Sequence, residues 1–170
     1  MKPATVDCDA SCLGLQLSPP ATGVWPPDMT AQDIIEKLNL QPHPEGGYYR
    51  QTWIETRDDD QRPSGTCIYF LLKSGERSHW HRVDAVEIWH HYTGAPLILS
   101  VAETGTGPAR DYVLGPDLNV GQSPQLIVPK HHWQAARTTG DYTLVGCTVS
   151  PGFRFEGFEL AEDNFDIPKA

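Results

Sequence analysis

The sequence is poor in basic residues and in long apolar runs. Only 13 Lys and Arg stand against 22 Asp and Glu, so the formal net charge is -9. Nucleic acids and anionic membrane surfaces are bound mainly through basic patches, so neither is an expected partner. No stretch approaches the length of a membrane span.

Cysteine is also scarce, and the four cysteines form no recognisable framework. Cys8 and Cys12 lie in a proline-rich start, whereas Cys67 and Cys147 lie inside apolar, strand-like runs. This spacing is that of neither a disulfide scaffold nor a zinc finger. The chain also has no positively charged start followed by an apolar run of signal-peptide length. We therefore expect free thiols and a reducing, cytoplasmic location.

A chain of 170 residues fits one domain with a sizeable core. Residues 1–29 mix five prolines with small residues and show no sustained period, which predicts a flexible N-terminal leader. Thr30 followed by Asp33 is a helix-start pattern, and the apolar residues after it form one stripe. We expect a short helix there that ends before Pro42, and a folded domain over 30–170.

From Tyr48 onward the pattern is that of β structure. β-branched and aromatic runs alternate with Gly, Pro, Asp and Ser clusters at the spacing of an all-β sandwich or barrel. No long helical period separates them, which argues against a parallel sheet with crossover helices. The predicted strands are Tyr48–Glu55, Thr66–Leu72, Ser78–Val83, Val86–Tyr92, Pro96–Glu103, Arg110–Leu114, Gln125–Val128, Trp133–Thr138, Tyr142–Val149 and Phe153–Glu159.

Histidines concentrate where two of these strands meet. His79 and His81 are two residues apart, and Glu87 follows on the next predicted strand. Residues two apart on a strand point to the same side, so both histidines and Glu87 are expected to face one interior. The same alternation places Trp89 and His91 on the side of Glu87. Such a cluster can bind a divalent metal, form a metal-free polar pocket, or serve as a buried structural network.

The run from Gly75 to Gly94 resembles the first signature of the cupin superfamily, in which two histidines and a glutamate bind a divalent metal. One extra residue separates His81 from Glu87. In the second signature, Gln134 takes the place of a third histidine, and glutamine is a weaker ligand for transition metals than imidazole. His131 or His132 could replace it if their loop bent inward, or both could be solvent-exposed turn residues. The resemblance implies a site for Fe, Mn, Ni or Zn with the ligands His79, His81, Glu87 and Gln134.

A closer resemblance covers about residues 34–160. Several strings are similar, in order, to those of a cupin family of unknown function, DUF985 or Cupin-5: His43–Arg50, Thr66–Leu72, Ser78–Val83, Glu87–Gly94, Trp133–Ala136 and Val149–Phe153. The family implies an all-β cupin double-stranded β-helix, a jelly-roll barrel, here with a short N-terminal helix. It also implies a deep pocket without an established ligand and, often, a homodimer.

Six further residues are candidates for contacts with a ligand, and His91, on the side of Glu87, is one of them. His43 and Glu45 flank a proline before two glycines, and this string is either a structural turn or a loop that overhangs the pocket mouth. Arg50 could bind a carboxylate or phosphate, or lie solvated on its strand. Trp89 and Trp133 could stack on a flat ligand or pack in the core.

Two classes of function follow from these residues. The first is an enzyme, either metal-dependent, with isomerase, hydrolase or oxygenase chemistry, or with His81 and Glu87 acting directly as acid and base in an epimerisation. The second is a non-catalytic module that binds, senses or stores a sugar or nucleotide, since this fold hosts both. A scaffold that acts through its dimer interface is a third option, with Tyr48–Glu55 as the edge strand that pairs.

Overall fold

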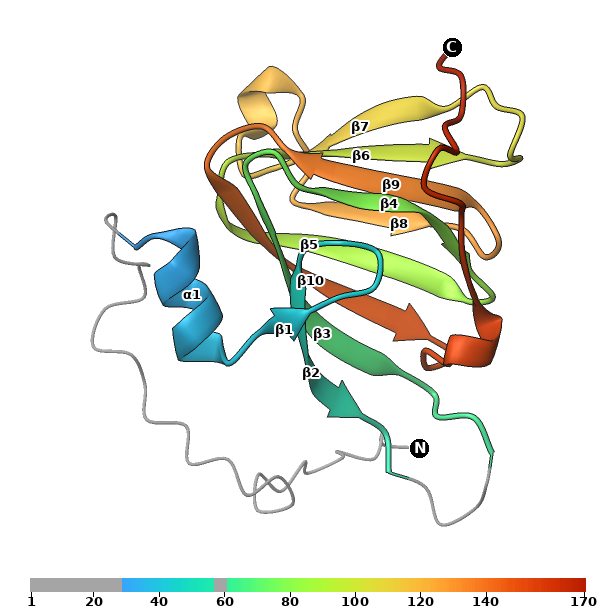
Figure 1. Cartoon of the computed structure of the whole chain (residues 1–170), viewed down its shortest axis with the longest axis horizontal. Helices are drawn as coiled ribbons and strands as arrows, with labels where there is room; N and C mark the ends of the chain where they lie inside the picture. The colour runs from blue at the N-terminus through green and yellow to red at the C-terminus, as the bar shows by residue number, and fades with distance from the viewer. Residues whose placement is uncertain (1–28, 57–60) are drawn as a thin grey trace, which may run out of the picture.

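The computed structural model describes residues 29–56 and 61–170, which form two antiparallel sheets packed face to face (Figure 1). The six-stranded sheet has the order β1-β2-β3-β10-β5-β8, and the five-stranded sheet has the order β11-β4-β9-β6-β7. The elements are α1 (Ala31–Leu38), β1 (Gln41–Pro42), β2 (Tyr48–Ile54), β3 (Thr66–Lys73), β4 (Arg77–Val83), β5 (Val86–Gly94), β6 (Leu97–Ala102), β7 (Arg110–Leu114), β8 (Gln125–Val128), β9 (Trp133–Thr138), β10 (Tyr142–Ser150) and β11 (Phe158–Leu160), with 3-10 turns at Leu118–Val120 and Phe155–Gly157. The predicted all-β architecture with one short helix is confirmed.

The main core lies between the two sheets. Phe70 and Leu72 of β3 and Trp89 of β5 point inward from the six-stranded sheet and meet Leu99 of β6 and Ala136 of β9. All five are buried, and the rings of Phe70 and Trp89 meet edge to face at 5.8 Å. Each large side chain of this kind contributes about 1.5–3 kcal/mol through burial. This packing fixes the strands that carry the site at one end of the core.

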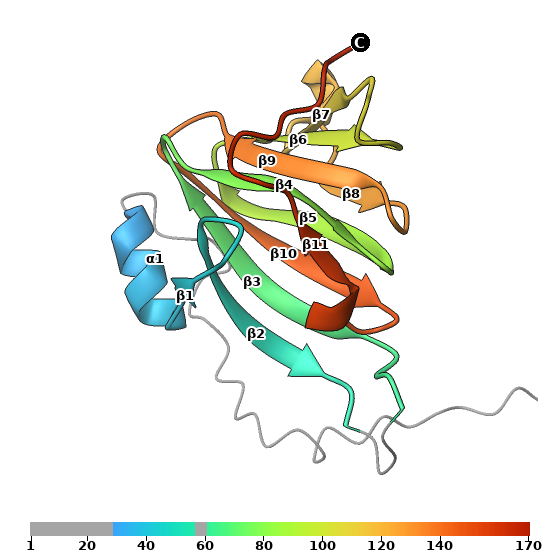
Figure 2. The ribbon, with the colours of Figure 1, turned by 45° about the vertical axis from the view of Figure 1, so that its right-hand side comes forward.

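Helix α1 covers the outer face of the six-stranded sheet beside β1 (Figure 1, Figure 2). The Thr30 hydroxyl accepts a hydrogen bond from the Asp33 backbone N–H, and the Asp33 carboxylate accepts one from the Thr30 N–H. This capping box begins the helix as the sequence predicts. Ile34 then packs on Leu71 and Leu144, so the helix closes the back of β3 and β10.

The C-terminal segment covers the outer face of the five-stranded sheet (Figure 2). The Trp80 indole N–H donates to the Asp166 carboxylate at 2.6 Å, and Ile167 is buried beside Trp80. The rings of Trp133 and Phe165 pack 5.1 Å apart. Both tryptophans therefore belong to a second core on the outside of β4 and β9.

The strand predicted over Phe153–Glu159 is wrong for its first part. The chain makes a 3-10 turn at Phe155–Gly157 and becomes extended only at β11. Tertiary contacts override the aromatic strand pattern here, because the Gly157 carbonyl accepts from the Asp84 N–H while the Phe153 N–H donates to the Thr66 hydroxyl. This irregular path brings the rings of Phe153, Phe155 and Phe158 into contact with one another.

Other expectations stay predictions. The leader predicted over 1–29 falls, except for Met29, on residues outside the described ranges, as do Cys8 and Cys12. Cys67 and Cys147 are free thiols. Within the described ranges, no helix combines the length and apolarity needed to cross a bilayer. The cytoplasmic location stays a prediction.

Candidate functional site

A cavity of about 230 Å³ opens between the sheets, where β3 and β5 begin and β4 and β10 end. Its polar and titratable lining comprises His43, Glu45, Gln51, Thr66, His81, Glu87 and Cys147. The rest of its described lining is aromatic or aliphatic: Tyr49, Ile68, Phe70, Val83, Val149, Phe153, Phe155 and Phe158. A few ionisable groups in a largely apolar cavity are typical of a small-molecule site.

The loop before β2 is shaped to bring Glu45 into this cavity. Gly46 and Gly47 have φ angles of 107° and 70°, which side-chain-bearing residues rarely adopt. A Cβ on Gly46 would lie 2.2 Å from the Arg77 carbonyl oxygen. The loop is also tied to β4, because the His79 N–H donates to the Glu45 carbonyl at 2.8 Å. The glycines predicted from sequence to form a turn therefore also present a buried carboxyl.

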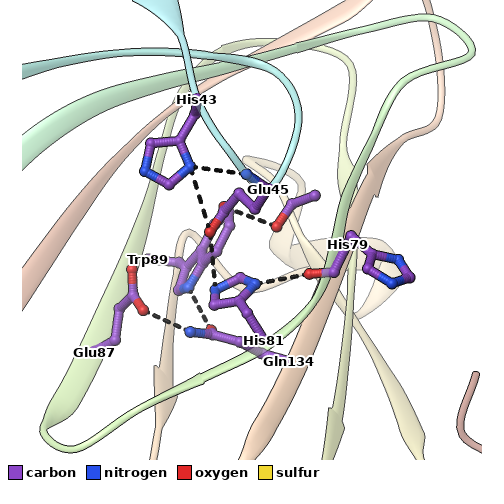
Figure 3. A network of polar contacts seen from close by, with 8 residues as sticks. His43, Glu45, His79, His81, Glu87, Trp89 and Gln134 are labelled. Atoms are coloured by element: carbon purple, nitrogen blue, oxygen red, sulfur yellow. Dashed lines mark hydrogen bonds and ion pairs between the residues drawn. The ribbon is translucent and has the colours of Figure 1, made fainter. Parts of the chain in front are cut away.

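Both oxygens of Glu45 have neighbours inside the cavity (Figure 3). Oε1 accepts a hydrogen bond from the Ser78 hydroxyl at 2.8 Å. Oε2 lies 3.3 Å from Nε2 of His81 and 3.6 Å from Nδ1 of His43. Burial raises the pKa of Glu45 to about 7, while His43 and the Ser78 hydrogen bond act in the opposite direction. Near neutral pH this carboxyl can therefore both give and take a proton.

The imidazole of His81 is held in one tautomer. Its Nδ1 lies 2.8 Å from the His79 backbone carbonyl, which can only accept, so Nδ1 carries the proton. Nε2 then presents a lone pair to Glu45. Burial lowers the pKa of His81, which keeps the ring neutral near pH 7. The proton of Glu45 is thus placed between Oε2 and Nε2, and the pair can pass it either way.

His43 stands on the other side of the same carboxyl. Its Nδ1 accepts the Glu45 backbone N–H at 3.4 Å, and burial lowers its pKa. The ring also meets Tyr49 edge to face at 4.5 Å. His43 is therefore a neutral neighbour of Glu45 that closes one side of the cavity. The interpretation of this loop as one that reaches the pocket agrees with the position of both residues.

Glu87 is held by a second, separate network (Figure 3). The Trp89 indole N–H donates to Oε1 of Gln134 at 3.0 Å, and Nε2 of Gln134 donates to Glu87 at 2.5 Å. An indole can only donate, so the amide has this orientation and its oxygen accepts the indole hydrogen bond. Burial raises the pKa of Glu87, and the Cys147 thiol hydrogen-bonds the same carboxyl. Trp89 therefore helps to position the Glu87 carboxyl through Gln134.

The expectation that His79 shares one side with His81 is wrong. The pairing of β4 with β9 shifts register between Ser78 and His81, so these two residues both face Glu45 although they are three apart. His79 points away (Figure 3), and its Nε2 lies 2.8 Å from the Glu162 carbonyl. An extra residue in a strand interrupts the alternation on which the expectation depended.

Three other predicted ligand contacts lie outside the cavity. The Arg50 guanidinium lies 5.5 Å from the centre of the Tyr69 ring. Nε2 of His91 faces a backbone carbonyl at 3.4 Å, in the part of β5 remote from Glu87. Trp133 packs in the outer core, because Gln134 beside it points inward and neighbouring strand residues alternate.

Sequence reasoning did not identify Ser78, Cys147 or the aromatic wall. Four of the five phenylalanines line the cavity: Phe70, Phe153, Phe155 and Phe158. The close spacing of the last three was the available signal, but it also fits an ordinary strand. Ser78 points inward only because of the β4 bulge, which the sequence does not announce.

The metal site implied by the family signature does not match these contacts. Of its four ligands, His79 faces outward, and the oxygen of Gln134 accepts a hydrogen bond from the Trp89 indole. Within the described part of the chain, no group of three or more His, Cys, Asp or Glu side chains is arranged to hold a metal ion. The residues present do not fit that metal site.

Comparison with known proteins agrees with this fold. An X-ray structure of a protein from Shewanella oneidensis shares 41% sequence identity, with a TM-score of 0.74, and the match covers 79% of this chain and 85% of that one. A hypothetical protein from Leishmania major shares 31% identity with a TM-score of 0.73, over 81% and 90% of the two chains. No curated protein matches the chain.

More distant structures share the fold alone. Oxalate decarboxylase from Bacillus subtilis is 12% identical with a TM-score of 0.54, and the match covers 70% of this chain and 29% of that one. The family described as "Cupin superfamily (DUF985)", Cupin_5, matches residues 32–161. With that match and the 41% identical structure, the chain belongs to the Cupin_5 (DUF985) family of the cupin superfamily.

Proposed function

We propose that the protein is an acid–base enzyme that isomerises or epimerises a small molecule in the cavity, with Glu45 and His81 as the proton-transferring pair. The observation that carries this proposal is the 3.3 Å separation of Glu45 Oε2 and His81 Nε2 inside the cavity. General acid–base catalysis works best with a pKa near the working pH, and burial brings the pKa of Glu45 to about 7. The fold gives no independent support, since cupin barrels host many activities.

The pair can be written as a base and an acid. When its proton moves to Nε2, Glu45 is a carboxylate beside an imidazolium. The carboxylate takes a proton from a carbon next to a substrate carbonyl, and the Nε2–H of His81 gives its proton to the developing enolate oxygen. Return of a proton to the other face of that carbon, or to its neighbour, completes an epimerisation or an isomerisation and restores the pair.

The other polar residues position this pair. Ser78 holds Oε1 of Glu45 and the His79 carbonyl holds Nδ1 of His81, so both reactive atoms are directed at one another. Glu87 lines the same cavity behind Gln134. Its role as an acid, expected from the sequence, stays a prediction.

Solvent deuterium exchange tests the proposal without a known substrate. Ketones, hydroxy ketones and α-amino carbonyl compounds with apolar bodies are incubated with protein in D₂O, and loss of the C–H signal is followed by NMR. We expect catalysed exchange that falls about 100-fold or more in His81→Ala and Glu45→Gln. His79→Ala is the matched control, because this residue lies two positions away and faces outward.

Two results would overturn the proposal. Wild-type exchange in a folded His81→Ala variant would remove the pair from the chemistry. Binding without exchange, for every compound that binds, would instead favour the non-catalytic binding module.

We also propose a homodimer that forms through the free part of the β2 edge. Among the described residues, β1 pairs with β2 only at Tyr48 and Tyr49. Beyond them Trp53 and Ile54 are 41% and 44% exposed, and an open apolar edge favours pairing with a second copy. Of the predicted edge strand Tyr48–Glu55, we therefore propose that only the second half pairs with the partner subunit. A monomeric mass by light scattering at micromolar concentration would refute the dimer.

A further inference from the structure

The cavity has an uneven charge distribution. Glu45 and Glu87 both line it and are only 8% and 7% exposed, and its described lining includes no Lys or Arg. Burial lowers the pKa of both imidazoles, His43 and His81, so neither supplies a positive charge at neutral pH. An anion placed here would lose its hydration beside two carboxyls without gaining a cationic partner.

A nearby cation is already paired. Arg62 donates from Nε to the Gly152 carbonyl, next to Phe153 of the cavity wall. Its two terminal nitrogens bind the two oxygens of Asp84 at 2.8 and 2.7 Å. This bidentate arrangement pairs the guanidinium charge with one carboxylate. The charge of Arg62 is therefore neutralised outside the cavity.

One wall of the cavity is aromatic. Phe153 lies 5.1 Å from Phe155 and 5.8 Å from Phe158, measured between ring centroids. The Phe158 ring in turn lies 5.5 Å from the His81 ring, so the wall reaches the proton-transferring pair. The faces of aromatic rings carry negative potential and attract cations, most strongly where water is excluded.

We infer that the substrate is a small organic cation: an amine whose ammonium group is bound by Glu45 and Glu87 and whose apolar body packs on the phenylalanine wall. Compounds with a carboxylate or phosphate head group should not bind in this cavity. This inference rests on the cavity being the substrate site of the proposed function. It adds the charge class of the substrate, which the proton-transferring pair alone does not determine.

Binding of a cation should release a proton. The ammonium group is attracted to an ionised carboxyl, whereas burial keeps Glu45 partly protonated up to a pKa of about 7. The affinity for an amine should therefore rise by about tenfold or more per pH unit below pH 7, because burial also raises the pKa of Glu87. A neutral ligand with the same body should show no such dependence.

Calorimetry with three matched compounds tests the charge selection. 2-Phenylethylamine, 2-phenylethanol and 3-phenylpropionate share one apolar body and carry a positive, a neutral and a negative head group. At pH 7.5 we expect the amine to bind at least tenfold more tightly than the alcohol, and the carboxylate not to bind. Equal binding of amine and alcohol, tighter binding of the carboxylate, or binding of none of the three would overturn the inference.

Variants connect the selectivity to named residues. In Glu45→Gln/Glu87→Gln the advantage of the amine over the alcohol should disappear, while the alcohol still binds. Phe158→Leu keeps an apolar wall and should weaken the amine more than the alcohol. The exposed Glu103 gives a matched control, since Glu103→Gln should leave the ratio unchanged. An unchanged ratio in the double variant would contradict the inference.

The binding measurements and the exchange measurements can refute their two proposals independently, because the former record binding without turnover. Selection of the amine with no deuterium exchange would overturn the proposed enzyme activity alone. Exchange that depends on His81 in a cavity that prefers the carboxylate would overturn the charge selection alone.

Discussion

Replacing Glu45 by glutamine should make the protein more stable at alkaline pH than the unchanged chain. In the folded protein burial raises the pKa of this carboxyl from 4.5 to about 7. Each pKa unit corresponds to about 1.4 kcal/mol, so the carboxyl disfavours folding by about 3 kcal/mol above pH 7, relative to acidic pH. Glutamine stays neutral and can still accept the Ser78 hydrogen bond.

The sign follows from which state holds the proton. Because the folded-state pKa lies above the unfolded-state value, this part of the stability is fully present below pH 4.5 and is lost as the pH rises through about 7. The lowered pKa values of His43 and His81 act in the opposite direction, with stability lost as the pH falls. The contribution of Glu45 is therefore obtained from the difference in unfolding free energy between the variant and the unchanged protein.

Urea unfolding followed by tryptophan fluorescence measures this difference between pH 4.5 and pH 8. We expect the unfolding free energy of Glu45→Gln, relative to the unchanged chain, to increase by about 3 kcal/mol across that range. The same substitution at exposed Glu103 should give a flat difference. A flat difference for Glu45→Gln as well would refute the claim that burial keeps this carboxyl protonated.

Three further predictions follow from the contacts. Gln134→Leu leaves the Trp89 indole and the Glu87 carboxyl without their buried partner. The free energy of unfolding in urea should therefore fall by about 2–4 kcal/mol. A decrease of less than about 1 kcal/mol would mean that Gln134 does not bridge Trp89 and Glu87. Thr30→Ala removes the helix cap that bonds Asp33 and should lower stability by about 1 kcal/mol, while an unchanged value would argue against the capping box. Protein purified without a histidine tag or chelator should contain well below one equivalent of Fe, Mn, Ni or Zn by elemental analysis. One equivalent of metal in the unchanged protein, absent from His81→Ala, would contradict this prediction and support the metal site.

The strands could be predicted from sequence because burial on a sheet leaves a local pattern. The predicted Thr66–Leu72, Ser78–Val83 and Val86–Tyr92 differ from β3, β4 and β5 by one or two residues at their ends. The turn at Phe155–Gly157 could not be predicted, because three aromatic residues in a short run match a strand equally well. Its conformation depends on distant partners such as Asp84.

The side chains that face the interior were predicted correctly where alternation holds and incorrectly where it is interrupted. His81 and Glu87 both line the cavity as expected. The bulge in β4 turns His79 outward and brings Ser78 inward, and no residue type in that strand signals a bulge. Glu45 was considered a ligand contact, but its pairing with His81 depends on how a loop folds over a strand far along the chain.

The most direct test of the account is ¹⁵N NMR of the His81 imidazole as a function of pH. The account predicts a neutral ring protonated at Nδ1 at pH 7, with a pKa below 6.5. A neutral ring protonated at Nε2, or an imidazolium at pH 7, would contradict it, because Nε2 would then have no lone pair to share with Glu45.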